Sequence, residues 1–236
     1  EVNRNNNIIK TKGIMKKIEP LKFQFIGSID DPKQTQIFFL PNYDWNYYDK
    51  SLLGIKFYNR LFPSNGFSYS LSPLYSVEQN SIAGNLKVGY EIYKINNLIN
   101  KMKTGILFEK YSYQHNVHNS NLTREYSRIE PFIEFEFKNK TARSKEQRFF
   151  RTELIHLDKG YEKLNFLNSN YKFVNSRTIN PYSISIRSQF GHELQKGDLT
   201  IKYQYQINKK KHINIRGYLG IINSTNTNYN LTISAW

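Results

Sequence analysis

The sequence predicts an all-β fold: an antiparallel up-and-down transmembrane β-barrel, partial in this chain, with about 10–12 strands. Three observations lead to this prediction. Apolar and polar residues alternate with a period of two, and aromatic residues are abundant although the mean hydropathy is low. The longest apolar run, residues 37–40, is far shorter than the roughly 20 residues of a membrane-spanning helix.

The alternation is clearest in the segment 199–207, LTIKYQYQI. Leu, Ile and Tyr fall on one face of this strand, and Thr, Lys and Gln fall on the other. In a soluble sheet the apolar face would meet a core, whereas in a membrane barrel it would meet lipid and the polar face would line a wet interior. Segments 67–76, 133–137 and 184–190 show the same pattern.

The composition favours the barrel. Only 39% of the 236 residues are apolar, but 15% are aromatic, with 18 Tyr and 16 Phe, and the mean hydropathy is −0.65. Such a chain has difficulty filling one large dry core, but it suits many strands with aromatic girdles and a polar interior. The absence of cysteine excludes a disulfide scaffold and thiolate metal sites.

In chain order, residues 1–20 are polar and basic, and we expect them to form a linker from an upstream domain. The chain begins at Glu1 without an initiator Met, so a fragment or a processed product is expected. Residues 21–236 are predicted to form the barrel. The expected strands are 35–43, 51–60, 67–76, 82–93, 101–113, 126–138, 147–157, 179–191, 198–207, 212–222 and 228–236. Their lengths match the roughly 9–11 residues that a strand needs to cross a bilayer.

The connections between these strands provide a second argument. Two long loops, 114–125 and 158–178, are expected at one end of the meander. The connections at the other end are predicted to be shorter, at 61–66, 94–100, 139–146 and 192–198. Long loops at one end and short turns at the other are typical of outer-membrane barrels. The argument depends on the strand count, and a soluble β-sandwich or lipocalin-like barrel is the alternative.

No residue of this chain is predicted to be catalytic, cofactor-binding or metal-binding. His192-Glu193 resembles the start of an H-E-x-x-H zinc motif, but Lys196 stands where the second His would be. His115 and His118 lie in a polar loop without a carboxylate-rich frame. A Gly-rich phosphate loop and a G-x-S-x-G nucleophile motif are also absent from the sequence.

The formal net charge of +15 points to anionic partners. Lys209–Lys211, together with the many aromatic residues, would formally allow binding of single-stranded nucleic acid. These lysines lie in one predicted turn, however, and phosphates of membrane lipid or lipopolysaccharide account for the same sign of charge. We therefore expect outer-membrane lipid, lipopolysaccharide and the barrel-assembly machinery as partners, and no nucleic acid.

The segment 40–76 carries the most distinctive pattern, and a Pro-rich entry precedes it. It resembles the start of the C-terminal outer-membrane barrel of Bacteroidota aminopeptidase N-like (gluzincin) metallopeptidases. Lys50 departs from the pattern, because such barrels more often have Gly there; a turn of the same kind lies at 138–144. The matching residues are Pro20, Leu21, Lys22, Phe23, Asn46, Tyr48, Asp49, Gly54, Asn59, Pro73, Tyr75 and Ser76.

This resemblance implies a barrel that anchors an upstream zinc aminopeptidase-like domain in the outer membrane of a Gram-negative bacterium. Zinc is then expected only upstream, and enzymatic activity of the parent protein stays open. The barrel would continue past Trp236; alternatively, 228–236 is a true C-terminal strand. The functional alternatives are a transport or BamA-like assembly barrel without an enzyme domain, and a soluble lipocalin-like binding barrel.

Overall fold

The computed structural model of the chain describes residues 21–27, 35–59, 66–93, 95, 97–115, 123–139, 141, 143–192, 194–208 and 211–224. These residues form twelve strands and, within the described ranges, no helix. The strands are β1 (Leu21–Phe25), β2 (Thr35–Asn46), β3 (Lys50–Tyr58), β4 (Gly66–Ser76), β5 (Ser81–Tyr93), β6 (Ile99–His115), β7 (Thr123–Phe137), β8 (Glu146–Asp158), β9 (Lys163–Asn175), β10 (Tyr182–Gly191), β11 (Leu194–Gln206) and β12 (His212–Ser224).

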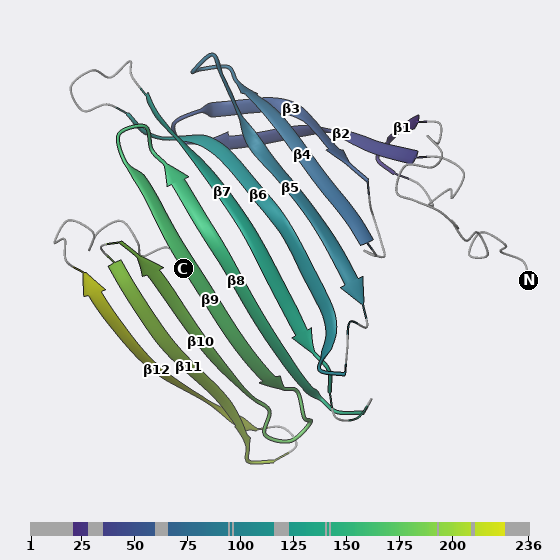
Figure 1. Cartoon of the computed structure of the whole chain (residues 1–236), viewed down its shortest axis with the longest axis vertical. Helices are drawn as coiled ribbons and strands as arrows, with labels where there is room; N and C mark the ends of the chain where they lie inside the picture. Colours follow the sequence, from purple (N-terminus) through teal and green to yellow (C-terminus); the bar gives the residue numbers. More distant parts are fainter. Residues whose placement is uncertain are drawn as a thin grey trace, which may run out of the picture.

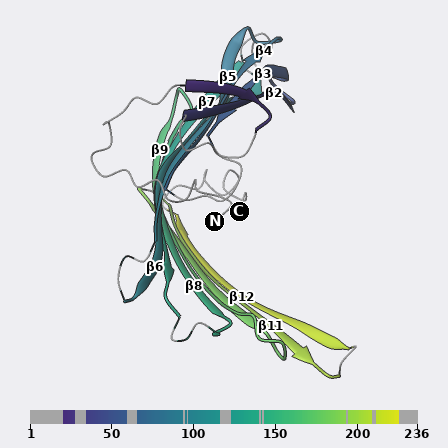
Figure 2. The same ribbon diagram turned by 90° about the vertical axis from the view of Figure 1, so that its right-hand side faces the viewer.

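All twelve strands belong to one sheet in which spatial order follows chain order (Figure 1). β1 pairs with β2 in parallel, and every later neighbour pairs antiparallel. The sheet is a single curved layer whose two edges, β1 and β12, do not meet (Figure 2). The prediction of an all-β, up-and-down partial barrel is therefore confirmed.

The connections define two ends of the sheet. The upper rim, as drawn in Figure 1, holds the connections 47–49, 77–80, 116–122, 159–162 and 192–193. The lower rim holds 59–65, 94–98, 138–145, 176–181 and 207–211. The upper-rim connections are two to seven residues long and the lower-rim ones five to eight. The predicted contrast of long loops at one end and short turns at the other is therefore wrong.

The error arises from β9, which occupies most of the predicted loop 158–178. Its sequence, KLNFLNSNYKFVN, is rich in Asn, which is depleted in strands. Its apolar residues also fall on both faces, since Phe166 and Leu167 are neighbours, so no alternation is visible. Full ladders to β8 and β10 nevertheless hold it in the sheet. β1 was also not predicted as a strand, and the predicted strand 228–236 lies outside the described residues.

Cross-strand register gives the sheet two different faces. One rung joins Tyr171, Ile186, Leu199 and Leu219 across β9–β12. The adjacent rung joins Asn170, Arg187, Asp198 and Gly220 across the same strands. Because successive side chains of a strand point to opposite faces, the two rungs lie on opposite sides. The same register extends through β2–β8, so one side is apolar along the sheet.

Burial distinguishes the outside of the curve from its inside. Within β2–β11, the exposed large hydrophobic side chains lie on the apolar face, apart from Tyr93. Ile186 is 48% exposed and Leu219 in β12 is 62% exposed. Buried strand side chains lie on the other face, apart from Ser112 beside an irregularity of β6. Curvature crowds the inner side, so the apolar face is convex and the polar face is concave.

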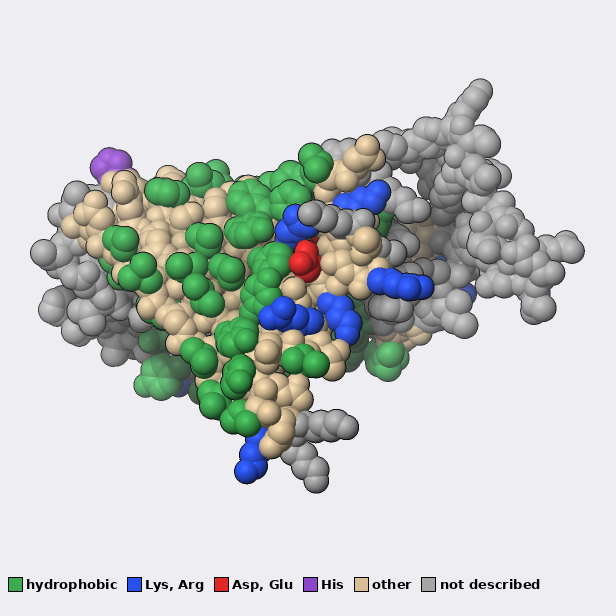
Figure 3. All heavy atoms as spheres, turned by 90° about the horizontal axis from the view of Figure 1, so that it is seen from below, with side chains coloured by type: hydrophobic (Ala, Val, Ile, Leu, Met, Phe, Trp, Pro, Cys, Tyr) green, Lys and Arg blue, Asp and Glu red, His purple; other side chains and the backbone are tan. Residues whose placement is uncertain are grey.

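No described segment covers the convex face, which follows the outside of the curve in Figure 2. Seen from below, hydrophobic side chains cover much of the surface over the lower half of the sheet (Figure 3). The described residues contain no helix long and apolar enough to cross a membrane. Among the convex residues of β4, β5 and β7 are Phe67, Tyr69, Leu71, Pro73, Tyr75, Ile82, Leu86, Val88, Tyr90, Ile92, Ile129, Pro131, Ile133, Phe135 and Phe137.

Convex-face aromatic residues gather toward the lower rim. Phe135 lies opposite Phe150, and Phe150 lies opposite Tyr171. Further along, Tyr182 lies opposite Tyr203, and the ring centroids of Phe173 and Tyr182 are 5.6 Å apart. Aromatic side chains thus recur on the convex face of neighbouring strands toward the lower rim. An aromatic girdle is built from residues of this kind.

The turn 47–49 is the most closely bonded part of the upper rim. Asn46 Oδ1 accepts hydrogen bonds from the backbone N–H groups of Tyr48 and Asp49, and Asn46 Nδ2 donates to Asp49. The carboxylate of Asp49, fully buried, also accepts from Ser112 N at 2.9 Å and from Ser112 Oγ at 2.5 Å. Ser76 Oγ donates to the Asp49 carbonyl. The turn of β2–β3 is thereby tied to β4 and β6.

Two further residues of the distinctive segment have a steric role. Gly54 lies so close to β4 that a Cβ atom there would stand 2.0 Å from the Pro73 carbonyl oxygen. Lys50 has a φ of 54°, a left-handed conformation that glycine adopts most easily. A glycine at this position would adopt the same conformation without strain.

Replacing Asp49 with Asn is expected to destabilise the sheet by about 1–3 kcal/mol, because an amide cannot accept all the buried donors around it. Urea unfolding of the protein in detergent micelles measures the change. Asp44→Asn is the control, since Asp44 is exposed and accepts a hydrogen bond from the adjacent Trp45 N. Equal losses in the two variants would show that the buried carboxylate has no special role.

Candidate functional site on the concave face

Charged residues on the concave face lie opposite partners of the other sign. Six rungs of the described ladders join an acid on one strand to a base on its neighbour on this face. The attraction between directly opposed charges stabilises an antiparallel pair. The pairs are Glu91–Lys103, Lys101–Glu136, Lys103–Glu134, Glu109–Arg128, Glu134–Arg151 and Arg187–Asp198.

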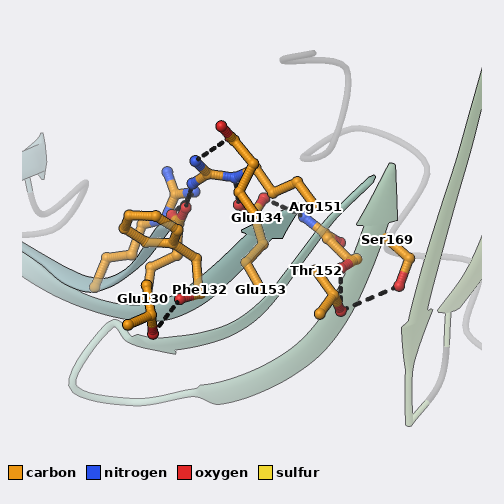
Figure 4. Close-up of polar contacts among 10 residues, drawn as sticks. Glu130, Phe132, Glu134, Arg151, Thr152, Glu153 and Ser169 are labelled. Atoms are coloured by element: carbon orange, nitrogen blue, oxygen red, sulfur yellow. Dashed lines mark hydrogen bonds and ion pairs between the residues drawn. The ribbon is translucent and has the colours of Figure 1, made fainter. Parts of the chain in front are cut away.

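Arg151 is the centre of the largest cluster, shown in Figure 4. Its Nε donates to Glu153 at 2.6 Å and its Nη2 donates to Glu130 at 3.1 Å. Its Nη1 lies 3.7 Å from Glu134, and its guanidinium stands 4.3 Å from the centre of the Phe132 ring. One arginine therefore links three carboxylates from β7 and β8.

Glu130 is the most enclosed acid of this cluster, with 6% of its side chain exposed. Arg128 pairs with its second oxygen, so two guanidinium groups surround one carboxylate. The centre of the concave face is thus a connected polar network. On the opposite, convex face of the same strands, the hydroxyls of Thr152 and Ser169 lie 3.2 Å apart (Figure 4).

Two smaller ion pairs flank the cluster. The Glu91 side chain is 4% exposed; its oxygens lie 3.1 Å from Lys101 Nζ and 3.4 Å from Lys103 Nζ. Arg187 donates two hydrogen bonds to the Asp198 carboxylate, from Nε at 2.8 Å and from Nη2 at 3.0 Å. Such forked contacts fix the geometry of both side chains. From β5 to β10 the concave face is therefore charged, but positive and negative side chains lie close together and largely balance.

This arrangement suits a wet, charged surface more than covalent chemistry. The carboxylates of the Arg151 cluster are occupied by guanidinium groups, and the other pairs are likewise matched. Among the described residues, no group of three or more His, Cys, Asp or Glu is placed to hold a metal ion. Two apolar clusters near the upper rim complete the face: Leu52, Leu74, Ala83 and Tyr111; and Ile155, Phe166, Leu194 and Leu164.

The residues that the sequence singled out do not come together. His192 is exposed in the β10–β11 connection, and Glu193 lies outside the described residues. The His115 side chain and His118 also lie outside them. Lys211 is exposed on the lower rim, whereas 209–210 are not described. The cross-strand ion pairs were missed, although the period-two recurrence of charge in 130–136 was a signal for them.

Comparison of the chain with protein-family models, with curated proteins and with solved structures finds no match.

Arg151→Gln is expected to destabilise the protein by about 1–3 kcal/mol, because three carboxylates lose a shared partner while Glu130 stays enclosed. The unfolding midpoint in urea, in detergent micelles, is the measurement. Arg143→Gln is the control, since Arg143 is exposed in the connection 138–145. A midpoint unchanged in both variants would mean that water replaces the lost contacts without cost.

Proposed function

We propose that this chain forms part of the wall of an outer-membrane β-barrel, with its convex face in lipid and its concave face toward a wet interior. The observation that carries the proposal is the two-sidedness of the sheet. Its apolar residues lie on the outside of the curve and no described segment covers them. Exposed apolar patches of more than a few hundred Å² are rare on soluble monomers and mark contact surfaces.

The dimensions of the apolar face support this proposal. On β5 the convex residues run from Ile82 to Ile92, which is about 34 Å along a strand. At a tilt of about 40°, this length projects to about 26 Å, close to the roughly 25 Å apolar band of outer-membrane barrels. The convex aromatic residues toward the lower rim fit one interfacial girdle.

The soluble alternative requires the opposite arrangement. A lipocalin-like barrel encloses a small ligand, and its own apolar side chains, within its interior. Here the interior side of the curve carries the Arg151 cluster and the other ion pairs, while the outside is apolar. The direction of curvature therefore favours lipid over a bound apolar ligand.

Strand directions bear on how such a barrel closes. β2 and β12 run in the same direction, because an even number of antiparallel steps separates them. Antiparallel closure onto β1 or β2 therefore needs one further strand, or another odd number, beyond β12. In lipid the backbone groups of an open edge would stay unsatisfied, so closure is required. We propose that additional strands complete the barrel.

The more specific proposal is an anchor for an upstream zinc aminopeptidase-like domain, in the outer membrane of a Gram-negative bacterium. It is supported by the resemblance of residues 40–76 and by the bonds that Asn46, Asp49 and Ser76 make in the upper rim. Its partners would be lipid, lipopolysaccharide and the assembly machinery. A transport or assembly barrel is the alternative, and an H-E-x-x-H motif encoded upstream of Glu1 separates the two.

The absence of cysteine from the sequence makes single-cysteine labelling a direct test of lipid contact. Two variants are made, Ile201→Cys and Lys202→Cys, at adjacent positions of β11. In each, the new cysteine is labelled with a fluorophore and the protein is reconstituted in vesicles. We expect brominated lipid to quench the fluorophore at 201, on the convex face, and a soluble quencher to reach the one at 202. Recovery of the protein in buffer without detergent, with both sites open to the soluble quencher, would contradict the membrane proposal.

A pair of arginine substitutions at the middle of β6 tests the same point energetically. Ile106→Arg, on the convex face, is expected to cost about 2–4 kcal/mol in a bilayer. Leu107→Arg should cost less, because this residue is concave and lies opposite Glu130. Urea unfolding in phospholipid vesicles measures both. In a soluble protein the order would reverse, since Ile106 is 47% exposed.

A further inference from the structure

One rung breaks the charge pattern of the concave face. Lys202 on β11 lies directly opposite Arg216 on β12. Every other rung of the described ladders that joins two charged residues joins opposite signs, and this includes Asp158–Lys163 near the upper rim. Like charges placed directly opposite destabilise an antiparallel pair. An arrangement that the rest of the sheet avoids therefore calls for a compensating negative charge.

The described residues supply no such charge nearby. Asp198, four residues before Lys202 on the same face of β11, accepts hydrogen bonds from two nitrogens of Arg187. The next pair below Lys202 on this face, Gln204 and Asn214, is neutral. No described acidic residue forms an ion pair with Lys202 or Arg216. A bound anion would supply such a charge.

A cavity of ≈ 650 Å³ lies at this rung, between the ends of β9–β12 near the lower rim. Its lining includes both Lys202 and Arg216, together with the convex Tyr182 and Tyr203. Arg177, from the connection 176–181, also lines it, but its guanidinium stands 5.2 Å from the Tyr182 ring and its Nε donates to the Asn180 carbonyl. As far as the described residues go, the lining contains no Asp or Glu. Ser183, Gln204 and Asn214 add neutral hydrogen-bonding groups on the concave side.

We propose that this cavity binds a phosphate-type oxyanion between Lys202 and Arg216. Cβ atoms of directly opposite residues are about 5 Å apart, so two cations on adjacent strands can reach one oxyanion. Charge-assisted hydrogen bonds to phosphate are roughly twice as strong as neutral ones. The bound oxyanion converts the repulsion on this rung into two attractions. The phosphate group belongs either to a small solute or to a lipid headgroup, and both present the same oxygens.

Thermal unfolding of the whole chain in detergent micelles tests this proposal, with inorganic phosphate as the probe. Sodium chloride at equal ionic strength controls for screening of the repulsion. Phosphate is expected to raise the Tm of the wild type beyond the effect of chloride, because a ligand that binds the folded state stabilises it. In calorimetric titrations, Lys202→Gln and Arg216→Gln should each weaken phosphate binding, raising the Kd by about tenfold.

The double variant Lys202→Gln/Arg216→Gln gives a second, opposite signature. Without phosphate its Tm should exceed that of the wild type, because the repulsion is gone, and phosphate should then add nothing. Lys87→Gln is the matched control: it removes an exposed cation from the same face, on β5, and should keep the wild-type response to phosphate. A double variant that retains the phosphate response would overturn the proposal.

Vesicles with and without phosphatidylglycerol identify the source of the phosphate group. Stabilisation by this lipid that requires Lys202 and Arg216, without a response to free phosphate, would assign the site to a headgroup. A response to free phosphate in micelles without lipid would assign it to a solute. If neither phosphate nor the lipid acts through these two residues, the cavity is not an anion site. Because micelles suffice for the main test, its outcome is separate from that of the membrane proposal.

Discussion

Cross-strand register is the constraint on which the rest of this structure depends. The sheet is one layer thick, so each strand residue belongs either to the convex or to the concave face. A shift of one residue between two neighbouring strands would move every side chain of a strand to the opposite face. Leu199 lies opposite Ile186 and Leu219, and Asp198 lies opposite Arg187. The apolar surface and the ion pairs therefore have the same origin.

Curvature gives the two faces different physical demands. Side chains on the concave side are crowded, and Glu91, Glu130 and Asp198 are nearly enclosed even though no second layer of described strands covers them. An enclosed charge that loses water needs a partner of opposite sign close by. The arginines and lysines of adjacent strands supply these partners. On the convex side exposure is high, and the side chains need no partner if the surroundings are themselves apolar.

The sequence was sufficient for most of the strands, because their alternation is a local property. It failed for β9, where Phe166 packs with Ile155 and Leu194 on the concave face while its neighbour Leu167 is convex. Only the ladders to β8 and β10 make this segment a strand. The concave-face contacts failed for a related reason: Asp49 and Ser112 are 63 residues apart, and no local pattern specifies that distance.

The mean hydropathy of −0.65 shows why composition alone is a poor guide to the surroundings of such a sheet. An average over the chain mixes two faces that meet different media. On β11, Ile201 and Tyr205 are convex and close to half exposed, whereas Asp198 and Thr200, on the same strand, are concave and buried. The usual rule that apolar residues lie inside and polar ones outside is inverted along one strand. A folded protein in water has no reason to bury charge and expose Ile in this way, since each exposed apolar Å² costs about 25 cal/mol. In a bilayer, hydrocarbon covers the convex residues, and this cost disappears.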